Sequence, residues 1–558
     1  MLKYIISIFI VQSINILAQV SVSTDSVRFP QINTGASDSI FLFLKNEYSE
    51  SSYIRINSIK KIYTFSDSAL IVPANDSLIV WVKYTPNQNV IDNDLMIITS
   101  EDSTIGTIIQ LSGSGKYGDI YDATTFNLYD TQLKNALTQL VSGHTSLGYN
   151  VARDNMYMVI DNQKVNGQGA TQNTLECVYT GRLAVGYINR TDAQNNYNFN
   201  TEHTWPQSNF GEAEPMKSDL YHLYPTDNPA NAIRSNYAFG NVVSNITWQI
   251  GGSKLGSNNI GQIVFEPRDV HKGDVSRSMF YFITRYPVNY GNFFTQTQEN
   301  VFREWNKLDS VGTVESNRNN AIALLQGKRN PFIDHPEFAD RIYSFTTNNV
   351  RPVIAELIVL PLKLNFDSTT INNTTSKQIY IANTGSAQLI VDSVTISDTR
   401  FTIDRNNISI EPYSSLEAMM QFNPDSIKKY DAILTVYSNG GNEQIVLTGI
   451  GNDNTVNIED RSVTLQAFYL EQNYPNPFNP STIIRWNSPV SGWQTLKIYD
   501  ILGNKVATLV NEFREAGNYE VTFSSLEAGQ AISLPSGVYF YRLQAGDFID
   551  TKKMLYLK

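Results

Sequence analysis

Short runs of alternating apolar and polar residues make up residues 19–115. Examples are Ser39-Ile-Phe-Leu-Phe-Leu and Leu78-Ile-Val-Trp-Val-Lys-Tyr, and turn clusters such as Asn33-Thr-Gly and Pro73-Ala-Asn-Asp separate the runs. Because successive side chains of a strand point to opposite faces, this alternation indicates strands with one buried face. Short strands with turns at this spacing predict an antiparallel β-sandwich.

A second copy of this pattern covers residues 351–452. Val82-Lys-Tyr-Thr-Pro aligns with Met420-Gln-Phe-Asn-Pro, and Leu111-Ser-Gly-Ser-Gly aligns with Leu447-Thr-Gly-Ile-Gly. The interval between the copies is far longer than the period of a solenoid, so we expect two separate flanking modules. Both resemble the immunoglobulin-like Hydin and abnormal-spindle family, a resemblance that implies a fold and no activity.

Residues 116–350 have a different sequence pattern and are expected to form a domain of the α+β class. Segments 126–140 and 314–325 have helix-like sequences, and all five histidines of the chain lie in this region. Candidate chemistry is therefore sought between the two predicted sandwiches.

The last region, residues 465–558, follows a linker at 453–464. It contains Tyr474-Pro-Asn-Pro-Phe-Asn-Pro-Ser-Thr, Asp500-Ile-Leu-Gly and Ser536-Gly-Val-Tyr-Phe-Tyr-Arg-Leu. Strand pairs after a proline-rich turn predict a small β-sandwich. The region resembles the C-terminal sorting domain of the type IX secretion system, which implies passage through an outer membrane and removal of the domain. A terminal binding module is the alternative.

The N-terminus has the pattern of a signal peptide at residues 1–18. It begins Met-Leu-Lys, continues with an apolar run at 4–10, and has the small residue Ala18 before the mature start. Gln12, Ser13 and Asn15 leave the run too short for a membrane anchor, which needs about 20 apolar residues. We expect export to a secreted or cell-surface location, without stable membrane insertion.

Composition and charge narrow the function classes. Cys177 is the only cysteine, which excludes an intrachain disulfide and a cysteine-based zinc cluster and favours a buried apolar role. The net charge of −11 is not that of a tight nucleic-acid binder, whose footprint is basic. The concentrated positive charge of a catalytic metal would still allow weak, transient binding of phosphate.

The most informative stretch of the central region reads Asn198-Phe-Asn-Thr-Glu-His-Thr-Trp-Pro. Glu202 and His203 are neighbours in an extended segment, so their side chains can serve different partners. One can face a metal while the other faces an attacking water. A structural ion pair is the alternative for an isolated Glu-His dipeptide.

A second stretch predicts a short helix that carries two more polar side chains. Asn228 followed by Pro229 indicates an N-cap with proline in the first helical position. The helix then presents Asn231 and Arg234 one turn apart on the same face. Taken alone, each polar residue could equally be a cap or a solvated loop residue.

Together the two stretches resemble the bacterial endonuclease I family of non-specific nucleases with a ββα-metal core. The matches span residues 120–345, and so many in order are not expected by chance. They are Glu202-His203 with Trp205-Pro206, Ser218-Asp219-Leu, Leu223-Tyr-Pro225, Asn231 with Arg234-Ser-Asn236, Phe265-Glu-Pro267, Lys272-Gly-Asp274, Thr284-Arg285-Tyr286, Trp305, and Arg329-Asn-Pro-Phe-Ile-Asp334-His335-Pro336.

The resemblance implies a secreted Mg²⁺-dependent endonuclease that hydrolyses phosphodiester bonds of DNA, with RNA as a further substrate, and leaves 5′-phosphate ends. Glu202 and Asn231 match the family's metal ligands, hard oxygen donors that suit Mg²⁺, with Mn²⁺ or Ca²⁺ as alternatives. His203 matches the general base that deprotonates the attacking water, so activity is expected to fall as pH drops through its pKa. We expect a monomer with weak sequence discrimination, exported by the type IX secretion machinery.

The chain departs from the family pattern at two points. The family often has His-Asn where this chain has Tyr221-His222, so His222 is expected to support the site in another way. The loop after Phe210 is short and leaves no counterpart for a family arginine that stabilises the transition state. Arg234 is the candidate substitute, and the remaining histidines are expected to be structural.

Two other functions remain open from the sequence. One is a surface adhesin with an inactive nuclease-like domain, which loss of Glu202, His203 or Asn231 would have favoured; all three are present. The other is a metal-dependent hydrolase of another substrate, but neither a His-Glu-x-x-His run nor a Gly-x-Ser-x-Gly elbow occurs to support it.

Overall fold

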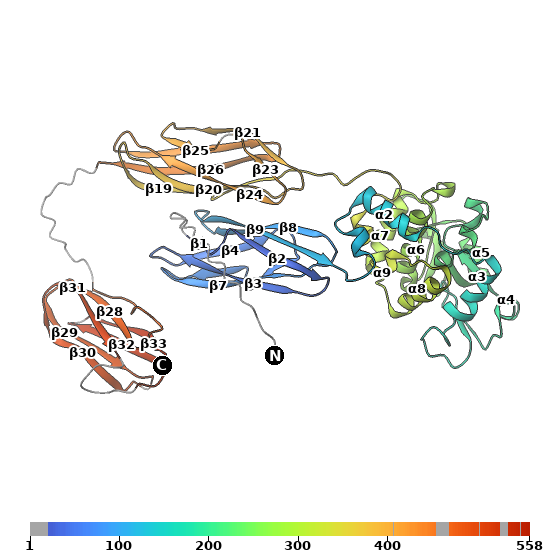
Figure 1. Ribbon diagram of the computed structural model, residues 1–558, viewed down its shortest axis with the longest axis horizontal. Helices are drawn as coiled ribbons and strands as arrows, with labels where there is room; N and C mark the ends of the chain where they lie inside the picture. The colour runs from blue at the N-terminus through green and yellow to red at the C-terminus, as the bar shows by residue number, and fades with distance from the viewer. Residues whose placement is uncertain are drawn as a thin grey trace. The chain divides into compact units, whose positions relative to one another are not determined.

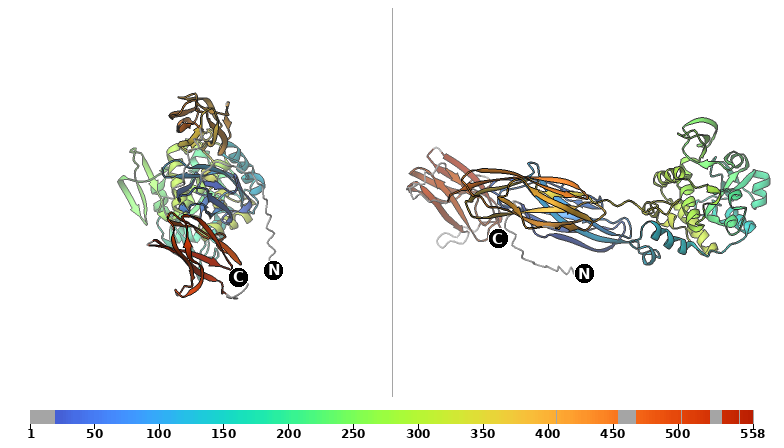
Figure 2. Two further views of the ribbon diagram at one scale, coloured as in Figure 1. Left: turned by 90° about the vertical axis from the view of Figure 1, so that its left-hand side faces the viewer. Right: turned by 90° about the horizontal axis from the view of Figure 1, so that it is seen from above.

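The computed structural model describes residues 20–405, 407–453, 468–501, 503–524, 534–546 and 548–557. The signal peptide expected at 1–18 and most of the linker expected at 453–464 lie outside these residues. The helices belong to the central region of the chain, and the regions before and after it are built of strands (Figures 1 and 2). Within the described ranges, no helix is both long and apolar enough to cross a membrane. The chain is multidomain and mostly β, as predicted.

The first sandwich consists of two sheets, with strand orders β1-β3-β7-β5 and β2-β9-β8-β4-β6. Their inward side chains form one apolar core that includes Leu42, Val80 and Ile98. The strands are β1 (Val20–Val22), β2 (Ser26–Asn33), β3 (Asp38–Asn46), β4 (Ser52–Ser58), β5 (Tyr63–Phe65), β6 (Ala69–Val72), β7 (Ser77–Tyr84), β8 (Ile91–Ser100) and β9 (Gly106–Lys116).

The second sandwich repeats this topology strand for strand, with orders β18-β20-β24-β22 and β19-β26-β25-β21-β23. In each sandwich the second strand pairs in parallel with the last, and each of these pairs has a register shift. The shared topology explains the sequence repeat. The strands are β18 (Leu357–Leu360), β19 (Lys363–Thr370), β20 (Thr375–Asn383), β21 (Leu389–Ile396), β22 (Phe401–Ile403), β23 (Ser409–Ile410), β24 (Ser414–Phe422), β25 (Lys429–Ser438) and β26 (Gly441–Asn452).

Gly115 and Gly451 show why the closing motif of the two sandwiches is the same. A Cβ atom added to Gly115 would lie 2.1 Å from the carbonyl oxygen of Gln88, and one added to Gly451 would lie 2.1 Å from that of Ser426. Both obstacles are backbone atoms, which no side-chain rotation can move. Only glycine lets the last strand pass this loop.

The central region has a helical core around α6 (Lys272–Arg285), which is buried along nearly its whole length. The predicted helices at 126–140 and 314–325 correspond to α2 and α8, although α2 begins only at Asp130. The other helices are α1 (Asp122–Thr125), α2 (Asp130–Val141), α3 (Tyr149–Asn155), α4 (Arg190–Tyr197), α5 (Asn228–Arg234), α7 (Gln296–Leu308), α8 (Thr313–Gln326), α9 (Pro331–Asp334) and α10 (Phe338–Arg341).

Three small sheets flank this core: β10-β11, β12-β13 and β14-β17-β16-β15. Ser278 on α6 fixes the second of them, because its Oγ donates to the Tyr221 carbonyl and lies 2.8 Å from Thr204 Oγ1. The strands are β10 (Thr174–Glu176), β11 (Leu183–Val185), β12 (Phe199–His203), β13 (Leu223–Asp227), β14 (Ala238–Phe239), β15 (Ser244–Ile250), β16 (Ser253–Ser257) and β17 (Ile263–Glu266).

The C-terminal unit is a small two-sheet sandwich, as the alternation of its residues predicts. Its strand orders are β27-β28-β31 and β30-β29-β32-β33, around a core that includes Trp486, Leu496 and Tyr541. The strands are β27 (Tyr469–Leu470), β28 (Ser481–Ser488), β29 (Gly492–Tyr499), β30 (Lys505–Arg514), β31 (Gly517–Ser524), β32 (Gly537–Ala545) and β33 (Phe548–Tyr556).

Candidate active site

The two polar stretches of the sequence form one local unit: strand β12, strand β13 and helix α5. The strands pair antiparallel, with Glu202 opposite Tyr224 and His203 opposite Leu223. Helix α5 follows β13 without a loop and packs on β12. The unit therefore brings residues from both stretches to one place.

The cap of α5 corrects one sequence prediction. The N-cap is Asp227, whose carboxylate accepts a hydrogen bond from the Ala230 amide at 2.9 Å, and Asn228 is already the first helical residue. A carboxylate at this position also interacts favourably with the helix dipole, which explains why the helix begins one residue earlier than predicted. Asn228 instead ties α5 to the start of β12, through a 2.7 Å hydrogen bond from its side chain to Asn198.

Glu202 is buried and held by one hydrogen bond and one ion pair. Its Oε1 accepts a 2.8 Å hydrogen bond from the Tyr179 hydroxyl and lies 3.1 Å from Arg234 Nε. Burial raises the pKa of Glu202, and the Arg234 charge and the Tyr179 hydrogen bond oppose that shift. Within the described residues, its second oxygen, Oε2, makes no hydrogen bond.

Arg234 lies beneath the site rather than at its surface, with only 1 % of its side chain exposed. Its guanidinium donates to the Thr204 and Ser235 carbonyls at 2.6 and 2.8 Å as well as pairing with Glu202. Direct contact with phosphate stays a prediction for this residue. Its visible contacts are those of a group that fixes the end of β12 and the orientation of Glu202.

His203 is held by its ring nitrogen Nε2, which lies 3.2 Å from the carbonyl oxygen of Lys217. A carbonyl only accepts, so Nε2 carries the proton and Nδ1 keeps its lone pair. Burial lowers the pKa of His203 well below its ordinary value, and the nearby His222, Arg234 and Lys217 lower it further. The imidazole is therefore neutral near pH 7.

His222 packs against His203. It is fully buried, its Nε2 donates to the Met216 carbonyl at 2.7 Å, and its ring lies edge-on to His203 with centroids 5.2 Å apart. Because Met216 and Lys217 are neighbours, the two histidines hold consecutive carbonyls of one short segment, η3 (Met216–Ser218).

Asn231 lies on α5 one turn before Arg234, in a half-buried position. In the described part of the chain its side-chain amide makes no hydrogen bond. Its side-chain oxygen and Oε2 of Glu202 are thus two hard oxygen atoms without a hydrogen bond among the described residues. Such a pair fits Mg²⁺, which takes few protein ligands and keeps several waters. No group of three or more His, Cys, Asp or Glu residues suited to a metal occurs among the described residues.

Two cations next to His203 were not among the predicted site residues. The ring of Tyr149 lies 5.6 Å from that of His203. Arg153 lies over the Tyr149 ring at 4.1 Å, and Lys217 Nζ lies 5.0 Å from its centre. Arg153 makes no salt bridge in the described residues, whereas Lys217 pairs with Glu212 at 2.6 Å. One sequence signal could have found Arg153, since the spacing from Tyr149 to Arg153 places both side chains on one helix face.

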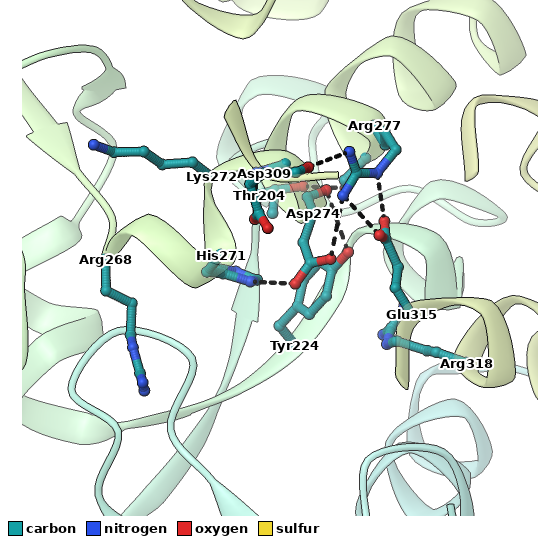
Figure 3. Close-up of polar contacts among 12 residues, drawn as sticks. Thr204, Tyr224, Arg268, His271, Lys272, Asp274, Arg277, Asp309, Glu315 and Arg318 are labelled. Atoms are coloured by element: carbon teal, nitrogen blue, oxygen red, sulfur yellow. Dashed lines mark hydrogen bonds and ion pairs between the residues drawn. The ribbon is translucent and has the colours of Figure 1, made fainter. Parts of the chain in front are cut away.

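A second polar cluster, made of His271, Asp274, Arg277, Glu315 and Arg318, lies around Tyr224 of β13 (Figure 3). Arg277 binds both oxygens of Glu315, at 2.6 and 2.7 Å, and His271 Nδ1 lies 2.9 Å from Asp274. Burial raises the pKa of Asp274 to about 6 and that of Glu315 to about 8, and it lowers the pKa of His271 to about 3. Residues of this cluster line a cavity of about 330 Å³. The Arg277–Glu315 pair joins α6 to α8, and His271 contacts Asp274 on α6; a structural role for His271 stays a prediction.

The other predicted structural residues also make internal contacts. His335 lies 2.7 Å from Asp119, and His144 accepts a hydrogen bond from Arg285. Cys177 is buried, as predicted.

Three regions of the chain match known protein families. Residues 130–337 match the family model "Endonuclease I", 355–452 match "HYDIN/CFA65/VesB-like, Ig-like domain", and 472–556 match "Secretion system C-terminal sorting domain". The first match includes the β12–β13–α5 unit, and the other two confirm the predicted resemblances in those regions.

Individual relatives are extracellular and periplasmic nucleases. An extracellular ribonuclease of Bacillus amyloliquefaciens is 33 % identical over 232 residues, which is 38 % of this chain and 74 % of the relative. An extracellular ribonuclease of Bacillus subtilis (strain 168) is 30 % identical over 269 residues, 44 % of this chain and 87 % of the relative. A periplasmic deoxyribonuclease of Aeromonas hydrophila is 26 % identical over 167 residues, 27 % of this chain and 68 % of the relative. The sorting domain and these relatives support secretion, and the chain belongs to the Endonuclease I family of nucleases.

Proposed function

We propose that this protein is a secreted endonuclease that hydrolyses phosphodiester bonds of both DNA and RNA, with His203 as the general base. The observation that carries the proposal is the anchoring of His203 Nε2 on the Lys217 carbonyl. This contact fixes the tautomer and leaves Nδ1 free to take a proton from water. The names of the relatives, ribonucleases and a deoxyribonuclease, support both substrates.

The environment of His203 suits a base better than an acid. A base must be unprotonated before the reaction, and burial together with neighbouring positive groups keeps the imidazole neutral. The His222 ring and the Lys217 carbonyl fix the orientation of the imidazole, so little reorganisation is needed when the proton moves.

Glu202 and Asn231 are the residues that would hold Mg²⁺, with Mn²⁺ or Ca²⁺ as alternatives. When bound, the ion would stabilise negative charge on the phosphate and on the leaving 3′ oxygen, giving 5′-phosphate products. Arg234 and Tyr179 engage only Oε1 of Glu202, which leaves Oε2 available as a ligand. The order strand, strand, helix supports assignment to the ββα-metal type of nuclease core.

Lys217 and Arg153 are proposed to bind the phosphate of the substrate. Each is packed against Tyr149, and the Tyr149 ring contacts His203, so both cations lie next to the base. Arg234 then acts as a positioning residue for Glu202. In this division of roles, Lys217 and Arg153 take the place of the family arginine at the phosphate, and the guanidinium of Arg234 stays buried.

The test uses protein lacking residues 1–18 and 465–558, supercoiled plasmid and a structured RNA, with Mg²⁺. His203→Ala and EDTA are the two controls, and His335→Ala is the matched histidine variant outside the site. We expect nicked and then fragmented DNA, fragmented RNA, and 5′-phosphates at the new ends, all lost in both controls and kept in His335→Ala. If both substrates survive wild-type protein with Mg²⁺, the proposal fails and the adhesin function becomes the better account.

A further inference from the structure

Exposed aromatic side chains lie on the sheet β1-β3-β7-β5 of the first sandwich, whose strands β3 and β7 are labelled in Figure 1. Phe41 pairs with Trp81 across β3 and β7, and Phe43 pairs with Ile79. All four side chains are 45–53 % exposed. The Phe41 ring contacts both Phe43 and Trp81 edge-on, with centroids 5.6 and 5.3 Å apart. A contiguous apolar patch of this kind on a sheet face marks an interaction site rather than scattered surface residues.

The charged residues at the outward positions of β3 and β7 have one sign. Continuing along the same alternating positions, Ser39 pairs with Lys83 at one end of the patch and Lys45 pairs with Ser77 at the other. The outward positions of the two strands thus carry lysines and no carboxylate, although the chain as a whole has a net charge of −11. Lys83 makes no salt bridge in the described residues, and Lys45 pairs only with the exposed Glu47.

The second sandwich, which has the same topology, does not share this surface. The strand pair that corresponds to β3 and β7 is β20 and β24, where Gln378 faces Met419 and Tyr380 faces Glu417. The aromatic and basic character is therefore a property of the first module's sequence and not of the fold.

We propose that this face binds single-stranded nucleic acid and so holds substrate on the enzyme, an inference that rests on the proposed nuclease function. Bases stack on aromatic side chains whatever their identity, and flanking cations contact the backbone phosphates. The face provides both elements, rings in the middle and lysines at the ends. It would also add sequence-independent binding to a chain whose net charge is −11.

The experiment measures binding by the full chain in EDTA, which prevents cleavage. Fluorescence anisotropy of a labelled single-stranded oligothymidylate is followed for wild type, for Phe41→Ser/Trp81→Ser and for Lys83→Glu. Trp493, exposed on the sorting domain, gives the matched control Trp493→Ser. Each lost stacking ring is expected to weaken binding about tenfold, and Lys83→Glu is expected to weaken it and reduce its salt dependence. Trp493→Ser is expected to bind as wild type does.

Tryptophan emission provides a readout that does not depend on stability. Oligothymidylate is expected to quench wild-type fluorescence, and Trp81→Phe is expected to remove that quenching while anisotropy still reports binding. Dextran sulfate and neutral dextran serve as competitors without bases. Unchanged binding by Phe41→Ser/Trp81→Ser would overturn the inference. It would also be overturned if dextran sulfate displaced the labelled oligothymidylate as effectively as unlabelled oligonucleotide does, or if neutral dextran displaced it.

The two proposals fail separately. Cleavage of a short duplex at saturating concentration is measured on the same preparations, and the face variants are expected to cleave it as wild type does. Binding without cleavage by wild-type protein in Mg²⁺ would contradict the nuclease function alone. Cleavage with equal binding by all variants would contradict the binding face alone.

Discussion

Replacing Arg234 with methionine tests whether this residue supports the site from within. The side chain is 1 % exposed and pairs with Glu202 while satisfying the Thr204 and Ser235 carbonyls. Methionine fills a similar volume but leaves a buried carboxylate without its cation and two carbonyls without their donors. Breaking a buried ion pair by removing one partner costs about 3–5 kcal/mol.

Hydrogen exchange measures this loss locally, which is needed because a multidomain chain does not unfold in one step. Amides of β12 and α5 that exchange through opening of this unit are expected to exchange at least about 100-fold faster in Arg234→Met, since each 1.4 kcal/mol is a factor of ten. Amides of the second sandwich serve as the internal control and are expected to be unchanged.

The double variant Glu202→Gln/Arg234→Met separates the ion pair from the rest of the effect. Removing the carboxylate together with its partner is expected to restore part of the lost protection, because neutral glutamine costs less to bury than an unpaired charge. The reasoning is refuted if Arg234→Met changes protection by less than tenfold. It is also refuted if the effects of the two single changes simply add.

Three further predictions concern the cations beside His203, the Asp274–Glu315 cluster and the second sandwich. Arg153→Met and Lys217→Met are each expected to lower kcat/KM about tenfold or more, the loss expected from one charged hydrogen bond to phosphate. Steady-state kinetics on a short duplex measure this value. Unchanged kcat/KM would show that these cations do not bind the substrate. The raised pKa values of Asp274 and Glu315 make the stabilisation from these groups complete at low pH, and it is lost as pH rises through about 6 to 8. Glu315→Gln is therefore expected to flatten the fall in domain stability between pH 5 and 9, measured by denaturant unfolding. Parallel curves of stability against pH for wild type and variant would contradict this. Gly451→Ala is expected to lower the melting temperature of the second sandwich, because the added Cβ would lie 2.1 Å from a carbonyl oxygen. Gly441→Ala is the control: no atom lies within 4 Å of its added Cβ, so it isolates the cost of a positive φ.

The parts of this structure that the sequence predicted are local ones. Alternation along β3 and β7 predicted strands, the spacing of Asn231 and Arg234 predicted one helix face, and the repeated glycine motif predicted a duplicated module. The first two depend on residues a few positions apart, where the period of the backbone decides which side chains share a face, and the third depends on the likeness of two short motifs.

The parts that the sequence did not predict depend on distant contacts. Tyr179 reaches Glu202 from 23 positions away, and Tyr149 reaches His203 from a separate helix. The burial of Arg234 follows from the packing of α5 on β12, which no spacing in a single sequence reveals. Asp227 rather than Asn228 caps α5 because both residues are good caps and only the backbone geometry of β13 decides between them.

Chemical rescue of His203→Gly tests the central claim most directly, that the neutral imidazole at this position takes the proton from water. The variant removes the ring and leaves Glu202, Asn231 and the cations in place. The account predicts that Mg²⁺-dependent cleavage of plasmid falls at least about 100-fold, the low end for a general base, and is partly restored by free imidazole in proportion to its neutral form. Cleavage by His203→Gly at the wild-type rate, or a loss that imidazole does not relieve at any pH while Mg²⁺ still binds, would contradict it.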